Sequence, residues 1–122
     1  MKPSKTSFFT SLVQSFGFAF DGFRTLLKER NFVIHLIAAA VAVALGAYLQ
    51  ISTVEWCIIV ICIGLVLTAE GFNTAIELLC DRITKDKDPT IVKIKDISAS
   101  AVLILALVSI VIAGLIFLPK II

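Results

Sequence analysis

A short stretch of the chain, residues 70–81, carries acidic and amide side chains at helical spacing inside an otherwise apolar region. At about 100° per residue, its polar groups fall within a stripe roughly 100° wide on one face of a helix. The stripe consists of Glu70, Asn73, Thr74, Glu77 and Asp81. Carboxylates at two levels with an amide between them can bind a cation, take up a proton or orient a hydroxyl group.

The two glutamates of this stripe are expected to have different roles. Glu70 and Glu77 lie about 10.5 Å apart along the helix axis, which is too far for both to bind one metal ion. Glu77 is suited to Mg²⁺, which favours one or two carboxylates together with phosphate oxygens. Glu29, expected at the same membrane level, is its candidate partner. Glu70 is expected to lie deeper in the membrane than Glu77 and farther from water, which suits a general base acting on an alcohol. Asn73 lies between the two acids and can orient either one.

Two polar features lie outside the stripe. Lys95 and Asp96 stand just before an apolar run, and Lys95 could meet a phosphate there. Taken alone, the pattern is more typical of a positively charged anchor at the cytoplasmic surface. His35 is expected to be a hydrogen-bonded structural residue. The sequence contains no Gly-rich phosphate loop, so any nucleotide would be held by side chains and metal.

The composition indicates that membrane helices position these groups. Of the 122 residues, 59% are hydrophobic and 16% are charged, against about 25% charged in soluble domains. This balance excludes a soluble globular domain and a disordered chain. The net charge of +2 is too small to indicate nucleic-acid binding. The spacing of Cys57, Cys62 and Cys80 fits neither a disulfide framework nor a zinc site.

Three runs carry no formal charge, at 31–54, 56–69 and 97–119. About 20 apolar residues span the hydrocarbon core, so the second run must continue as a helix past Glu70. The sequence therefore predicts an all-α integral membrane protein with transmembrane helices over 32–50, 55–80 and 97–118, forming one domain over 1–122.

Residues 7–28 have a different pattern, with apolar residues at helical spacing and polar residues on the other side. This is typical of an amphipathic helix at the membrane surface, the alternative being a short soluble helix packed on the cytoplasmic loop. Residues 84–92 are predicted to form a solvated connection, because Pro89 disfavours a helical conformation at Asp88.

The basic residues predict the orientation. Ten of the eleven Lys and Arg residues, including Lys2 and Lys5, precede the first span or lie between the second and third. The positive-inside rule makes that side cytoplasmic, with the N-terminus inside and the C-terminus outside. Glu70 then lies in the cytoplasmic third of the membrane, where an unpaired charge costs roughly 2.5–3.5 kcal/mol or more. A helix merely emerging into the cytosol explains Asp81 well but Glu70 poorly.

Four blocks of residues together resemble the prokaryotic diacylglycerol kinase family. They are Glu29-Arg-Asn-Phe-Val-Ile-His35, Glu55-Trp56, Glu70-x-x-Asn73-x-x-x-Glu77-x-x-x-Asp81 and Lys95-Asp96. The resemblance covers residues 17–118 and implies a homotrimeric bundle with an N-terminal surface helix in the bacterial inner membrane. It also implies transfer of phosphate from MgATP to a lipid alcohol.

Carried over residue by residue, the resemblance implies a role for each matching position. Glu70 would be the catalytic base on the lipid hydroxyl, supported by Asn73. Glu29 and Glu77 would coordinate the Mg²⁺ on ATP. Lys95 would contact the γ-phosphate and Asp96 the nucleoside side, which reverses the interpretation of Lys95 as an anchor alone.

The chain departs from the enterobacterial members at two positions. Val92 replaces a glycine that contacts the nucleotide, and Val33 replaces an arginine. The Glu29 to His35 block and the Glu55-Trp56 pair are more similar to the Gram-positive members, many of which are undecaprenol kinases. The sequence therefore favours undecaprenol over diacylglycerol as substrate.

Two other classes of function fit parts of the pattern. In a small proton-coupled transporter, Glu70 would be a relay carboxylate. In a structural membrane subunit, the polar stripe would serve helix association. Both leave the Lys95-Asp96 pair and the spaced carboxylates unexplained.

Overall fold

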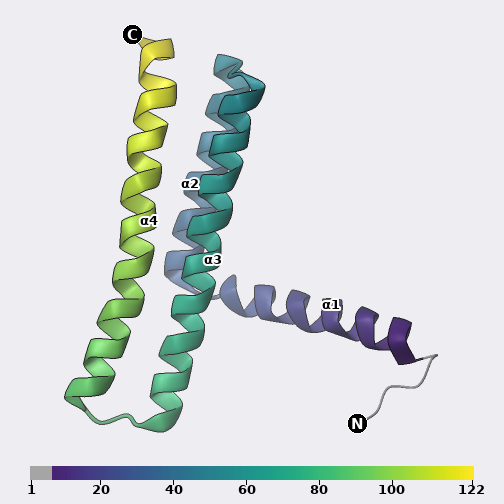
Figure 1. The fold of residues 1–122 in the computed structure, drawn as a ribbon, viewed down its shortest axis with the longest axis vertical. Coiled ribbons are helices and arrows are strands. Elements are labelled where there is room, and N and C mark those ends of the chain that lie inside the picture. Colours follow the sequence, from purple (N-terminus) through teal and green to yellow (C-terminus); the bar gives the residue numbers. More distant parts are fainter. Residues whose placement is uncertain (1–6) are drawn as a thin grey trace.

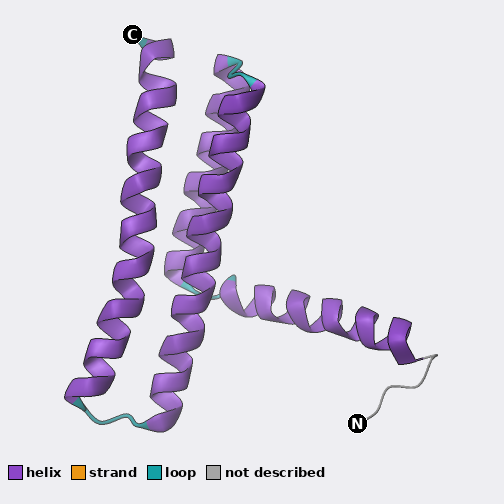
Figure 2. Cartoon of the chain, in the orientation of Figure 1, coloured by secondary structure: helices purple, strands orange, loops and turns teal. Residues whose placement is uncertain are grey.

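The computed structural model describes residues 7–122, and these residues form four α-helices and no strands (Figure 2). The helices are α1 (Ser7–Leu26), α2 (Arg30–Leu49), α3 (Thr53–Ile83) and α4 (Pro89–Ile121). Lys2 and Lys5, which contribute to the predicted orientation, lie outside the described residues. The all-helical prediction is therefore confirmed for the described part of the chain.

Helices α2, α3 and α4 run alongside one another, whereas α1 projects sideways from the start of α2 (Figure 1). Within the described residues, these three are long and apolar enough to cross a membrane. Helix α3 lies against both α2 and α4. A polar group on α3 can therefore contact both neighbours, which is the basis of the site described below.

Much of the apolar surface of this bundle has no partner within the chain. Exposed large side chains include Ile37, Tyr48, Ile61, Leu103 and Leu115, which lie on all three long helices. Exposed apolar residues on this scale are abnormal for a water-soluble monomer but fit contact with lipid or with other membrane helices. The structure is thus that of a membrane protein.

The connection between α2 and α3 is short and well capped. Gln50 adopts a left-handed conformation at the end of α2, with φ 51° and ψ 55°. Ser52 then forms a capping box, in which its hydroxyl accepts from the Glu55 N–H and the Glu55 carboxylate accepts from the Ser52 N–H. These bonds satisfy backbone groups that the helix ends would leave unpaired. They fix the residue at which α3 begins, and therefore the position of its polar residues along the bundle axis.

Helix α4 begins at Pro89, eight residues before the predicted span at 97, so the expectation of a connection through residue 92 is wrong. The Asp88 side chain accepts hydrogen bonds from the backbone N–H groups of Thr90 and Ile91. Proline fits the first helical position because its missing N–H has no helical partner there. Asp88 and Pro89 therefore start the helix, and Lys95 lies within it rather than at its start.

The best-packed apolar cluster lies at the end of the bundle far from the polar stripe. Ile51, Ile59, Ile116 and Phe117 are its buried members, and Trp56 packs against them. The Lys120 ammonium lies 3.3 Å from the Glu55 carboxylate, which joins the end of α4 to the start of α3. This end holds the helices together while the polar residues occupy the other.

Candidate functional site

The polar stripe of α3 lies largely inside the bundle. Glu70 is 3% exposed, and Asn73 and Thr74 are each 6% exposed. A buried carboxylate or amide is strongly disfavoured unless other groups satisfy it. The expectation that Glu70 does not face bulk solvent agrees with this burial, and the contacts of each buried group define the site.

Glu70 is paired with His35 of α2. The two side chains approach to 3.6 Å between His35 Nε2 and Glu70 Oε2, an ion-pair distance when the imidazole is protonated. His35 was expected to be a structural polar residue, and sequence reasoning did not identify Glu70 as its neighbour. The available signal was that both polar groups lie at similar depth in antiparallel helices that follow one another in the chain.

A second polar chain runs from α4 to Glu77. Ser98, which is 7% exposed, donates from its hydroxyl to Asn73 Oδ1 at 2.8 Å. Asn73 Nδ2 in turn donates to Glu77 Oε1 at 3.3 Å. Of the two acids that Asn73 could orient, Glu70 and Glu77, the structure shows its hydrogen bond to Glu77. Ser98 was not among the predicted site residues.

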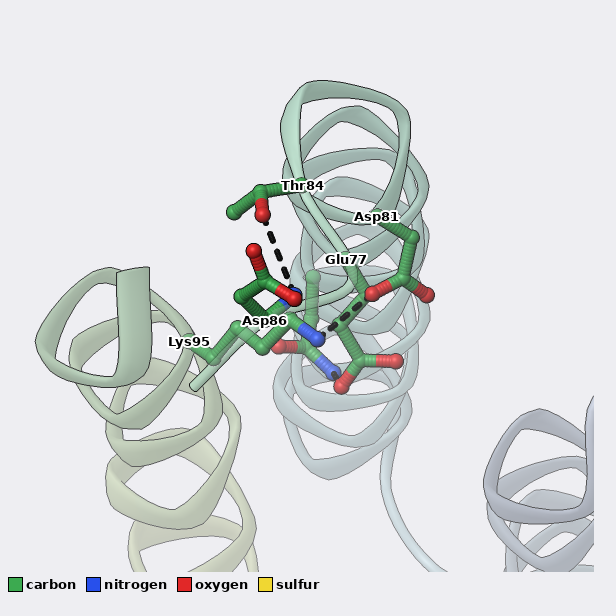
Figure 3. A network of polar contacts seen from close by, with 6 residues as sticks. Glu77, Asp81, Thr84, Asp86 and Lys95 are labelled. Atoms are coloured by element: carbon green, nitrogen blue, oxygen red, sulfur yellow. Dashed lines mark hydrogen bonds and ion pairs between the residues drawn. The ribbon is translucent and has the colours of Figure 1, made fainter. Parts of the chain in front are cut away.

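Lys95 reaches across from α4 to α3, where its ammonium lies 2.6 Å from Asp81 Oδ1 (Figure 3). Both residues lie beyond the predicted spans, and both are partly exposed. The hydrogen bond from Lys95 lowers the pKa of Asp81, and the same bond raises the pKa of Lys95. The charge of Glu77 also acts on Lys95 in that direction, so the two groups share one electrostatic environment.

Glu29 and Asp96 have no comparable place in this network. Glu29 is half-buried at the N-cap of α2, where its side chain makes no capping hydrogen bond. Asp96 is exposed on α4. No group of three or more His, Cys, Asp or Glu side chains suited to a metal occurs among residues 7–122. The carboxylate that the polar network holds in place is that of Glu77, and a single carboxylate can bind Mg²⁺ that arrives with phosphate oxygens.

Two cavities adjoin the polar residues. One, of about 350 Å³, is apolar and is lined by residues of all three long helices, including His35, Ala39, Val66 and Ala106. The other, of about 540 Å³, lies between α1 and α3 and is lined by residues that include Phe23, Leu26, Gly71 and Thr74. His35, the partner of Glu70, lines the first cavity, whereas Gly71 and Thr74 of α3 line the second. Both cavities have mainly apolar walls, which suit a hydrocarbon chain.

The described helices thus define a membrane protein whose polar stripe on α3 and Lys95 on α4 lie away from the Glu55–Lys120 end of a three-helix bundle, with apolar cavities nearby. Residues 17–117 match the family described as prokaryotic diacylglycerol kinase, and the chain belongs to that family. The resemblance drawn from the four sequence blocks is thereby confirmed.

Two relatives illustrate the range of the family. Undecaprenol kinase of Bacillus subtilis (strain 168) is 42% identical over 96 residues, which cover 79% of this chain and 78% of the relative. Diacylglycerol kinase of Escherichia coli (strain K12) is 27% identical over 109 residues, which cover 88% and 89%. The chain is accordingly a lipid kinase, and not the transporter or structural subunit that the polar stripe alone left open.

Proposed function

We propose that this kinase transfers the γ-phosphate of MgATP to the hydroxyl of a membrane lipid alcohol at the cytoplasmic interface. The observation that carries the proposal is the buried carboxylate of Glu70, which pairs with His35 beside an apolar cavity and lies one helical turn before Asn73, whose amide donates to Glu77. A carboxylate in that position can accept a proton from an alcohol whose hydrocarbon chain stays in the membrane.

In this mechanism, Glu70 takes the proton of the lipid hydroxyl while the hydroxyl oxygen attacks the γ-phosphorus of ATP. The bond from that phosphorus to the β–γ bridging oxygen breaks, and ADP leaves. His35 stays beside the Glu70 carboxylate and holds it within the bundle. Positioning of the two substrates supplies much of the rate acceleration.

The remaining residues bind the nucleotide. Glu29 and Glu77 would hold Mg²⁺, with Asn73 fixing Glu77 through its amide, and Asp96 would contact the nucleoside side. Mg²⁺ neutralises charge on the phosphates when bound. Lys95 exchanges its contact with Asp81 for the γ-phosphate, to which its ammonium is well suited as a point charge.

The lipid proposed is undecaprenol. The relative named undecaprenol kinase supports this choice, because it is more similar to this chain than the Escherichia coli diacylglycerol kinase is. The Glu29 to His35 block and the Glu55-Trp56 pair support the same choice.

The proposed setting is a homotrimer in the bacterial inner membrane, with the N-terminus in the cytoplasm and the C-terminus outside. Helix α1 would lie in the cytoplasmic interface through its apolar face. The many exposed phenylalanines of α1, such as Phe8, Phe16 and Phe20, support this placement.

A phosphotransfer assay tests the proposal. The purified protein is incubated with labelled ATP and Mg²⁺ in mixed micelles that contain undecaprenol or diacylglycerol, and the lipids are separated by thin-layer chromatography. We expect label in undecaprenol, dependent on Mg²⁺. A strong preference for diacylglycerol would overturn the choice of lipid, and no transfer to either would overturn the proposal as a whole.

A further inference from the structure

The hydrogen bond between Ser98 and Asn73 joins α4 to α3 inside the bundle. Both residues are buried, and the donor and acceptor atoms lie 2.8 Å apart. Ser98 lies outside the four blocks that resemble the family, and the proposed mechanism does not use it. Ser98 is therefore a buried residue that contacts a proposed site residue but has no role in the mechanism described above.

The chemistry of the three side chains gives the bond a direction. An ionised carboxylate only accepts hydrogen bonds, so Glu77 requires the Nδ2 end of the Asn73 amide. The Oδ1 end then points to α4. Because this amide oxygen is buried, it needs a hydrogen-bond donor there. The Ser98 hydroxyl supplies that donor. Without it, the buried Oδ1 would have no donor, and the Glu77 carboxylate alone would hold the amide in this orientation.

Ser98 also lies on the same face of α4 as Lys95, three residues earlier in the chain. The Ser98 to Asn73 bond and the Lys95 to Asp81 contact therefore link the same two helices at neighbouring levels. The Ser98 hydroxyl thus lies beside both the Asn73–Glu77 contact and the Lys95–Asp81 contact.

We propose that Ser98 is a positioning residue for the nucleotide site. It orients the Asn73 amide, which holds the Glu77 carboxylate in place to receive the metal–nucleotide complex. This inference rests on the proposed function, because it assumes that Glu77 contacts the metal carried by ATP.

The test compares Ser98→Ala with Ser100→Ala. Ser100 lies two residues away on α4, is exposed and donates only to the Ile97 carbonyl oxygen, so it is a matched control. We expect Ser98→Ala to raise the KM for MgATP about tenfold, in the range of one lost buried hydrogen bond. The KM for the lipid should stay the same, and Ser100→Ala should behave as the unchanged protein.

A second readout does not depend on turnover. Binding of Mn²⁺ with ATP, followed by electron paramagnetic resonance in micelles, should weaken by a similar factor in Ser98→Ala. In a Glu77→Ala background the same substitution should have no further effect, because Ser98 acts through Glu77. Equal KM and equal Mn²⁺ affinity in Ser98→Ala and Ser100→Ala would overturn the inference.

A variant pair of equal size keeps the test decisive if Ser98→Ala does not fold. Ser98→Thr retains the hydroxyl and Ser98→Val replaces it with a methyl group, so only the latter should weaken MgATP binding. Equal binding by both would contradict the role of the hydroxyl. If the unchanged protein transfers phosphate to lipid while these comparisons fail, the inference is wrong and the proposed function stands. If it transfers none, both are wrong.

Discussion

At the scale of single residues, the site depends on buried polar groups that pair across helices, Glu70 with His35 and Asn73 with Ser98. Glu70 was identified because it interrupts an apolar helix at a depth where solvent cannot reach it, and its 3% exposure agrees with that reasoning. His35 was expected to be a hydrogen-bonded structural residue, but its pairing with Glu70 was not predicted, and Ser98 was not among the predicted site residues. Contacts across helices depend on rotation about each helix axis, which a single sequence does not specify.

Glu77 gives the residue-scale prediction. Replacing it with alanine should weaken binding of MgATP by about 10–100-fold, the range found when groups that support a metal site are removed. The reason is that Asn73 positions this carboxylate where Lys95 and Asp81 also meet. Calorimetric titration of the variant with MgATP in micelles measures the change.

Glu55→Ala provides the control for this titration. Glu55 belongs to the opposite end of α3, where it pairs with Lys120, and its loss should leave MgATP affinity unchanged. Unaltered nucleotide affinity in Glu77→Ala would count against the metal role.

At the scale of elements, the lengths of the charge-free runs were sufficient to place three long helices but not their ends. The predicted connection over 84–92 is confirmed for residues 84–88 and wrong for residues 89–92. Pro89 does keep Asp88 out of a helical conformation, as expected, but the helix starts at the proline itself. Proline breaks a helix in its interior but favours its first turn, and Asp88 supplies the cap that starts α4 there. The early start brings Lys95 alongside Asp81.

Close packing of α2 against α3 gives the element-scale prediction. A Cβ atom added at Gly46 would lie 2.8 Å from Trp56 Cη2 and 3.0 Å from Ile51 Cδ1, so the indole ring would have to move. Gly46→Ala should lower the stability of the folded protein by about 1–3 kcal/mol, as overpacking does. Thermal unfolding in micelles measures this change.

Gly64→Ala is the matched control, because a Cβ atom at Gly64 meets nothing within 4 Å. We expect this variant to unfold at or above the temperature of the unchanged protein. If Gly46→Ala were equally stable, the contact between Gly46 and Trp56 would not hold the α2–α3 hairpin together.

At the scale of the whole molecule, composition predicted a membrane protein, and the family match supplied the activity. The exposed apolar side chains of α2, α3 and α4 fit a protein that contacts lipid or further subunits on several sides. The proposed homotrimer follows from the resemblance, because no pattern of helical spacing in this chain specifies how separate copies pack.

The asymmetry of basic residues gives a prediction at this scale. In a variant without its native cysteines, a cysteine placed at Thr53 should react with a membrane-impermeant thiol reagent in intact cells. One placed at Lys87 should react only after the membrane is opened. Both positions are exposed, so access to the reagent depends on the side of the membrane. The reverse pattern of labelling would show that the proposed orientation is inverted.

The central claim is that the buried Glu70 carboxylate takes the proton of the lipid hydroxyl. Its most direct test is single-turnover transfer of labelled phosphate by Glu70→Gln, with MgATP binding measured in the same sample. The amide preserves shape but cannot accept the proton, so the rate should fall by about 10²–10⁴-fold while MgATP affinity stays within about threefold. Transfer at the unchanged rate would show that Glu70 is not the base.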